Sequence, residues 1–267
     1  MTDARLTRRS FVTGSLALCG LASAPLRAAA VLGQHCLAAA RCSSFADSRT
    51  DRSRPSSSST RASSAPTSRA GIAVSREVFD ERASLLGDEQ ERWLFDGFNG
   101  SKARWNVIPQ QVMVAPADHA AGPDRTFSMD QWSGCDAART RLMKFLATRR
   151  PSNPIVLTGD IHSNWVNDLK VDFFDPKSPV VATEFVGRSI TSGGDGADRP
   201  DNYSTILAEN PFVKFYNGQR GYVSREVTAK QMRADYRIVE YVTRPGAPRQ
   251  TRASFVVEDG RPGAQEA

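Results

Sequence analysis

A short apolar strand that follows an amphipathic helix is the feature that most limits how this 267-residue chain can fold. Ala138, Leu142, Phe145 and Leu146 recur at the spacing of a core-facing helical stripe. The run from Ile155 to Leu157 then has the length and β-branched character of a buried strand. A helix that leads into such a strand predicts an α/β unit with parallel strands.

The polar residues after this strand form the first candidate site. Ligands bind at the carboxyl ends of strands in layered α/β folds. Asp160 and His162 are separated by one residue, so an extended backbone would send both side chains to the same face. A carboxylate and an imidazole aimed at one point make half of a metal site, and Gly159 gives the backbone room to turn. The alternative for this isolated pair is a turn-forming Asp and a structural His.

Further helices and strands are predicted on both sides of this unit. Asp88 and Glu91 resemble a capping box, and Leu94 and Phe98 lie one turn apart on one helical face. The stretch ARWNVIPQQVMVAP predicts a strand in which Pro109 indicates an edge or a bulge. GYVSREVT, DYRIVEYVT and RASFVVEDG alternate apolar and polar residues, as strands with one solvated face do.

Two other segments carry candidate functional residues. The loop from Ala115 to Ser133 contains His119, which is either a ligand or substrate contact or a surface histidine. VVATEFVGRSITSGG predicts an apolar strand followed by a turn rich in Ser, Thr and Gly. Its Arg188 is a candidate phosphate contact, because a guanidinium can hold two phosphate oxygens, or else it pairs with a carboxylate such as Glu184.

The N-terminal part has the composition of an export signal and a linker. Arg8 and Arg9 precede an apolar run with a small-residue exit, which predicts a twin-arginine signal over residues 1–30 that is too short to span a membrane stably. Residues 31–71 consist largely of Ser, Arg, Ala and Pro and predict a disordered linker. The net charge of +6 comes largely from this tract, but no nucleic-acid-binding motif accompanies it.

Several segments resemble, in consistent order, the C-terminal half of the alkaline phosphatase D (PhoD-like) family of metallophosphatases. They run from about Leu85 to the C-terminus: LLGDEQERWL, WNVIPQQVMV, QWSGCDAARTRLMKFL, IVLTGDIHSNWVNDL and VATEFVGRSITSGG. The resemblance implies an α/β fold over residues 72–267, the C-terminal part of a four-layer α/β/β/α metallophosphatase fold that is incomplete here.

The same resemblance implies a function for the candidate residues. Asp160 and His162 would be metal ligands, and Asn164 and Arg188 would act on the metal-bound oxygen or the substrate. The family uses iron and calcium to hydrolyse phosphomonoesters and phosphodiesters outside the cytoplasm. We therefore expect a phosphate-ester substrate, the twin-arginine export machinery as a partner, and a periplasmic or secreted location.

A second class of function competes with this one. The family takes many of its metal ligands from N-terminal segments such as GDYxY and DDHE, and neither occurs in this sequence. The alternative is therefore a truncated, catalytically inactive remnant or binding module of the same family. About forty unpatterned residues occupy the place of the first half of the core, which predicts a truncated or rearranged gene or a shifted reading frame.

Overall fold

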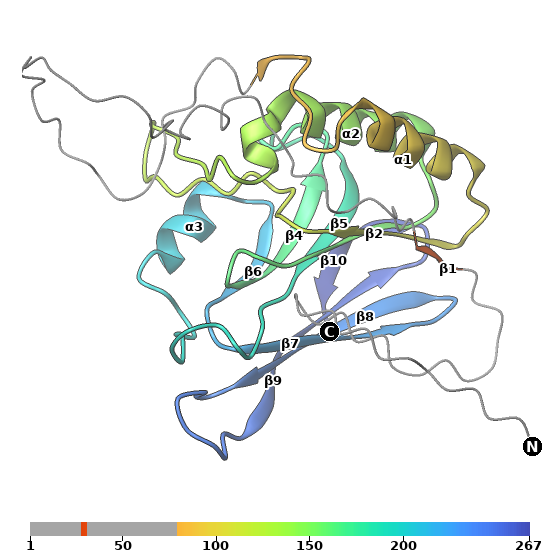
Figure 1. Ribbon diagram of the computed structural model, residues 1–267. Coiled ribbons are helices and arrows are strands. Elements are labelled where there is room, and N and C mark those ends of the chain that lie inside the picture. The colour runs from red at the N-terminus through yellow and green to blue at the C-terminus, as the bar shows by residue number, and fades with distance from the viewer. Residues whose placement is uncertain (1–27, 31–78) are drawn as a thin grey trace, which may run out of the picture.

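A computed structural model describes residues 28–30 and 79–267 of the chain, and in the first of these ranges only the backbone (Figure 1). The predicted twin-arginine pair and the whole of the predicted linker lie outside the described residues. The elements are β1 (Ala28–Ala30), α1 (Asp88–Gly100), β2 (Trp105–Gln110), the 3-10 helix η3 (Trp132–Cys135), α2 (Asp136–Arg149), β3 (Pro154–Thr158), β4 (Asn164–Lys170), β5 (Val180–Val186), α3 (Tyr203–Glu209), β6 (Val213–Asn217), β7 (Gly221–Val227), β8 (Gln231–Val239), β9 (Arg249–Glu258) and β10 (Arg261–Glu266).

The first sheet has six strands in the order β1-β2-β3-β5-β4-β6. Strands β1, β2, β3 and β5 are parallel, whereas β4 is antiparallel to both β5 and β6. The predicted parallel α/β unit is confirmed, because α2 connects the neighbouring parallel strands β2 and β3. All five residues of β3 are buried, as expected of a central strand covered on both faces.

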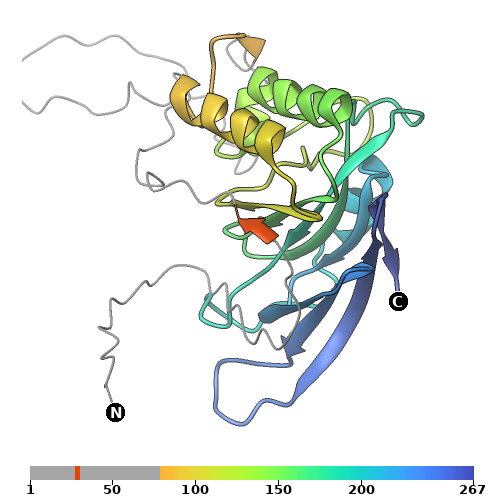
Figure 2. The same ribbon diagram turned by 90° about the vertical axis from the view of Figure 1, so that its right-hand side faces the viewer.

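Helices α1 and α2 cover one face of this sheet (Figures 1 and 2). The predicted helical stripes are confirmed: Leu94 and Phe98 of α1 are buried, and Leu142 of α2 packs in the same core cluster. The predicted capping box at Asp88 is wrong. Helix α1 begins at Asp88 itself, one residue earlier than a cap at that position requires, with Gly87 as N-cap and no side-chain capping hydrogen bond.

The second sheet covers the other face of the first sheet. It is antiparallel, with four strands in the order β10-β9-β8-β7, and it includes the three C-terminal strands predicted from alternation. Its inner face packs on the first sheet in a second core cluster that contains Trp105, Phe185 and Tyr236. The described residues therefore form three layers (Figure 2): the helices, the first sheet in the middle, and the second sheet.

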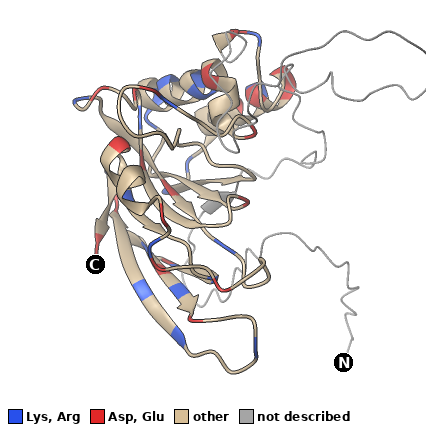
Figure 3. Cartoon of the chain, turned by 90° about the vertical axis from the view of Figure 1, so that its left-hand side faces the viewer, with Lys and Arg blue, Asp and Glu red and all other residues tan. Residues whose placement is uncertain are grey.

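The outer face of the second sheet is polar in the described part of the chain. Along β8, every second residue is buried, and the residues between them include Arg233, Asp235 and Arg237. The Asp235 carboxylate accepts hydrogen bonds from Arg233 Nε at 2.9 Å, Arg237 Nη2 at 3.1 Å and Ser254 Oγ at 2.6 Å. Figure 3 shows Lys and Arg (blue) along the curved strands of this sheet. A face of this kind is compatible with water. Three of the four layers of the α/β/β/α fold are present among the described residues.

Candidate functional site

The residues Gly159 to Ser163 form a tight turn at the carboxyl end of β3. The Ile161 N–H donates to the Gly159 carbonyl oxygen at 2.9 Å, which closes a three-residue turn around Asp160. Asp160 has a φ of 69° and His162 a φ of 58°, so both adopt the left-handed conformation that is unfavourable for residues with a Cβ. The expectation that an extended backbone points both side chains to one face is therefore wrong, because the chain reverses here to enter antiparallel β4.

The side chains of this turn divide between core and solvent. Ile161 is partly buried and packs on the helix-side core cluster, whereas Asp160 and His162 on either side of it are exposed. Within residues 79–267, neither of these two side chains has a hydrogen bond or an ion pair. The positive φ of these two residues is therefore not compensated by a side-chain contact within the described residues.

Asn164, the first residue of β4, forms hydrogen bonds through both the nitrogen and the oxygen of its side-chain amide. It is 1 % exposed, and its Nδ2 donates to Asn217 Oδ1 at 3.1 Å and to the Gln219 carbonyl oxygen at 3.0 Å. Its Oδ1 accepts the backbone N–H of Arg188 at 3.0 Å. The structure thus brings Asn164 and Arg188 together, but the amide of Asn164 positions the backbone after β5 and is not open to a ligand.

Arg188 lies beside the turn and is half-buried. The preceding residue, Gly187, donates its N–H to the Thr158 carbonyl oxygen at 2.9 Å and so joins the ends of β5 and β3. The guanidinium of Arg188 donates to the Gly218 carbonyl oxygen. Within residues 79–267, Arg188 forms no ion pair with Glu184. Arg188 was expected either to contact phosphate or to pair with a carboxylate such as Glu184. The pairing with Glu184 does not form.

Glu184 instead anchors the loop that follows β2. Its buried carboxylate accepts the backbone N–H groups of Val114 at 2.8 Å and Ala115 at 3.1 Å, together with Thr158 Oγ1 at 2.7 Å and Asn167 Nδ2 at 3.0 Å. Burial raises the pKa of Glu184, and the four donors oppose that rise. A carboxylate inside an apolar strand was the only sequence signal for this network.

His119 lies in the loop that begins at the carboxyl end of β2, at the same edge as the β3 turn. It is half-buried, and burial lowers the pKa of its imidazole while neighbouring Asp118 acts in the opposite direction. Its backbone N–H donates to the Thr126 carbonyl oxygen at 2.9 Å, and its ring has no hydrogen-bond partner within the described ranges. No hydrogen bond or ion pair joins it to Asp160 or His162 there.

The described residues do not complete a metal centre. Asp160 and His162 offer one carboxylate and one imidazole, and nowhere in residues 79–267 do three or more His, Cys, Asp or Glu side chains group as metal ligands would. A two-metal phosphoesterase site needs more ligands than this pair supplies. Asp160 and His162 alone therefore do not fit a resident metal cluster, and further ligands would have to come from outside the described residues.

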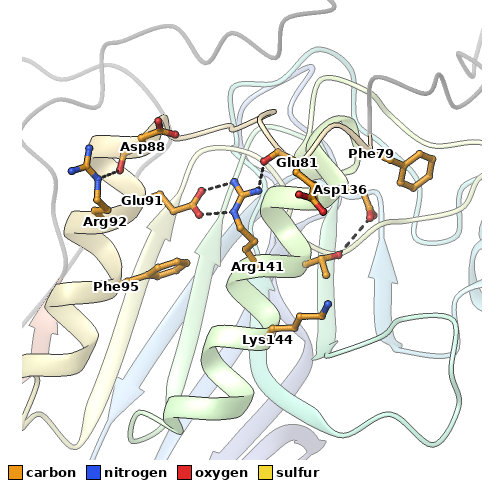
Figure 4. A pocket seen from close by; sticks show the side chains of 11 residues that line it. Phe79, Glu81, Asp88, Glu91, Arg92, Phe95, Asp136, Arg141 and Lys144 are labelled. Carbon is orange, nitrogen blue, oxygen red and sulfur yellow. Dashed lines mark hydrogen bonds and ion pairs between the residues drawn. The ribbon is translucent and has the colours of Figure 1, made fainter.

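A hollow of about 900 Å³ lies elsewhere, on the outer side of α1 and α2 (Figure 4). Arg141 of α2 donates across it to both carboxylate oxygens of Glu91 of α1, at 2.7 and 2.9 Å. Arg92, Lys144 and Asp136 also line it. None of the four residues expected in the site lines it, and the Arg141 guanidinium is engaged by Glu91.

The arrangement is that of a layered α/β protein with polar residues at the carboxyl ends of its parallel strands, and comparison with known proteins identifies the family. The model of the PhoD-like phosphatases matches residues 44–236, so the chain belongs to the PhoD-like phosphatase family. The match begins inside the segment predicted to be a linker and ends within β8.

Individual relatives agree with this assignment. The chain is 44 % identical over 192 residues to alkaline phosphatase D of Bacillus subtilis (strain 168), which covers 72 % of this chain and 33 % of that protein. A solved structure of PhoD superposes with a TM-score of 0.70 at 43 % identity, covering 73 % of this chain and 37 % of that one. The chain thus spans about a third of the length of these relatives. The resemblance seen in the sequence and a mixed α/β fold like part of PhoD are both confirmed.

Proposed function

We propose that this chain takes part in metal-dependent hydrolysis of phosphate monoesters or diesters, with the β3 turn as its contribution to the site. The observation that carries the proposal is the turn itself: Asp160 and His162 are strained, exposed and unpaired within the described residues, at the sheet edge where ligands bind. Membership of the PhoD-like phosphatases supplies the reaction class. Iron and calcium are the expected metals.

Each candidate residue has a distinct part in the proposal. Asp160 and His162 are metal ligands whose set is completed from outside the described residues. A bound metal would supply a nucleophilic oxygen of lowered pKa and neutralise the phosphoryl oxygens. Arg188 orients the phosphate, and Asn164 holds the backbone that carries Arg188.

The second candidate is a catalytically inactive remnant or binding module of the same family. It is favoured by one observation, the lack of a third metal ligand beside Asp160 and His162 in residues 79–267.

Export by the twin-arginine route to a periplasmic or extracellular location is proposed for either function. No helix in the described residues has the length and apolar character needed to cross a membrane.

One experiment separates the two candidates. Purified full-length chain and an Asp160→Ala, His162→Ala double variant are compared by metal analysis and by hydrolysis of a chromogenic monoester and diester. Asp96→Ala on the exposed side of α1 is the control for loss of a carboxylate. Stoichiometric metal and turnover that are lost only in the double variant support the phosphoesterase, whereas a folded wild-type chain with neither metal nor turnover supports the remnant.

A further inference from the structure

A nearly fully buried arginine lies beside the proposed site and has no acidic partner among the described residues. Arg220, just before β7, is 3 % exposed. Its guanidinium donates to three carbonyl oxygens, those of Ser192 at 3.1 Å, Gly218 at 3.5 Å and Gly193. Burial lowers the pKa of Arg220, and no described carboxylate acts in the opposite direction. Its charge is solvated by backbone dipoles alone, although buried charges are normally paired.

Arg188 brings a second positive charge to the same place. Its Nη1 donates to the Gly218 carbonyl oxygen, which also accepts from Arg220, so two guanidinium groups share one neutral acceptor. The Nε of Arg188 is buried without a partner, and its Nη2 has none in residues 79–267 either. Arg188 forms no ion pair within this part of the chain, so no described carboxylate neutralises either of the two cations there.

The segment that Arg220 holds supplies neutral donors. Ser189 Oγ lies 3.2 Å from Thr191 Oγ1 and 3.1 Å from Ser192 Oγ, which forms a cluster of three hydroxyl groups directly after Arg188. Thr191 is exposed. Hydroxyl and guanidinium groups are the donors with which proteins bind phosphate oxygens.

We propose that Arg188, Arg220 and the hydroxyl groups of residues 189–192 form a binding site for a phosphate oxyanion. Arg188 contacts the anion through its Nη2, which has no partner in residues 79–267 and is not among the buried atoms. Arg220 is a positioning residue, because its own donors are used by backbone carbonyls and it acts through its charge and through the loop it holds. The inference deepens the proposed function, on which it rests for the source of the anion: the phosphoryl group of the ester or the released inorganic phosphate.

The test measures binding of inorganic phosphate to the EDTA-treated full-length chain by titration calorimetry. We expect Arg188→Gln and Arg220→Gln each to weaken phosphate binding by about tenfold or more, because each substitution removes a positive charge near the bound anion. Arg237→Gln, which loses the same charge on the outer face of the second sheet, should bind within about twofold of wild type. Equal affinity in wild type and both variants, or no binding by wild type, overturns the proposal.

Two further measurements keep the result interpretable. Arg220→Lys retains the positive charge. If a folded Arg220→Lys protein binds phosphate and Arg220→Gln does not, the charge of Arg220 is what binding requires. If both Arg220 variants lose affinity equally and Arg188→Gln binds as wild type does, the proposed site is overturned. Ester hydrolysis is recorded on metal-loaded samples: phosphate binding without turnover refutes only the proposed function, and turnover with arginine-independent phosphate binding refutes only this site.

Discussion

The side-chain Oδ1 of Asn164 accepts the backbone N–H of Arg188 at 3.0 Å, which joins the start of β4 to the segment after β5. Because β4 follows the β3 turn directly, this bond fixes Arg188 relative to Asp160 and His162. The candidate site therefore depends on an amide that does not itself face a ligand.

Replacing Asn164 by Ala should destabilise the fold by about 2 kcal/mol, because buried groups on Arg188, Asn217 and Gln219 lose their partner. Urea denaturation measures the change. Asn99→Ala, on the exposed side of α1, is the control and should change the free energy of unfolding by less than about 0.5 kcal/mol. Equal effects of the two substitutions would contradict the anchoring role.

The backbone strain at Asp160 predicts a trade-off between stability and function. Asp160→Gly and Asp160→Ala both remove the carboxylate, but only Gly removes the steric cost of a φ of 69°. Asp160→Gly should therefore be more stable than Asp160→Ala by about 1 kcal/mol.

The control for the Asp160 pair is Ala137→Gly within α2, where the same Gly-for-Ala exchange should destabilise by about 1 kcal/mol. Thermal melts of the three variants give these differences. An Asp160→Ala variant as stable as Asp160→Gly would show that the turn is relaxed, and the functional argument from strain would be lost.

The raised pKa of Glu184 predicts a pH-dependent stability. The folded carboxyl keeps its proton to higher pH than the unfolded one, whose pKa is about 4.5. Its contribution is therefore fully present below that value and is lost as pH rises through the folded pKa. Glu184→Gln should flatten this part of the curve of unfolding free energy against pH, measured by denaturation between pH 4 and 8.

The control for Glu184 is Glu226→Gln on the exposed side of β7, which should leave the pH dependence unchanged. A Glu184→Gln curve parallel to that of wild type would mean that burial does not perturb this carboxyl group.

Tyr236 links the two sheets, because its buried hydroxyl donates to the Trp165 carbonyl oxygen of β4. Tyr236→Phe should lower the free energy of unfolding by about 1 kcal/mol, since it removes the bond but keeps the ring packing. Tyr222→Phe, which removes only a surface bond from Arg249, is the matched control and should have a smaller effect. The reverse order in denaturant titrations would contradict an inter-sheet role for the hydroxyl.

The sequence by itself determined the elements whose signal is local. The helical stripe through Leu142, the buried strand from Ile155 to Leu157 and the alternating C-terminal strands all appear where periodicity predicted them, because burial on one face imposes a period on the chain. The family resemblance could also be recognised from the sequence, because it rests on several motifs in a consistent order along the chain.

Only the tertiary structure decided how the polar residues are used. The reversal between β3 and β4 placed Asp160 and His162 in left-handed conformations, and strand order placed Arg220 against Arg188 across more than thirty residues of chain. These contacts join segments distant in sequence, and their geometry follows from which strands pair. Periodicity reports which face a residue occupies, but not which distant residue it meets.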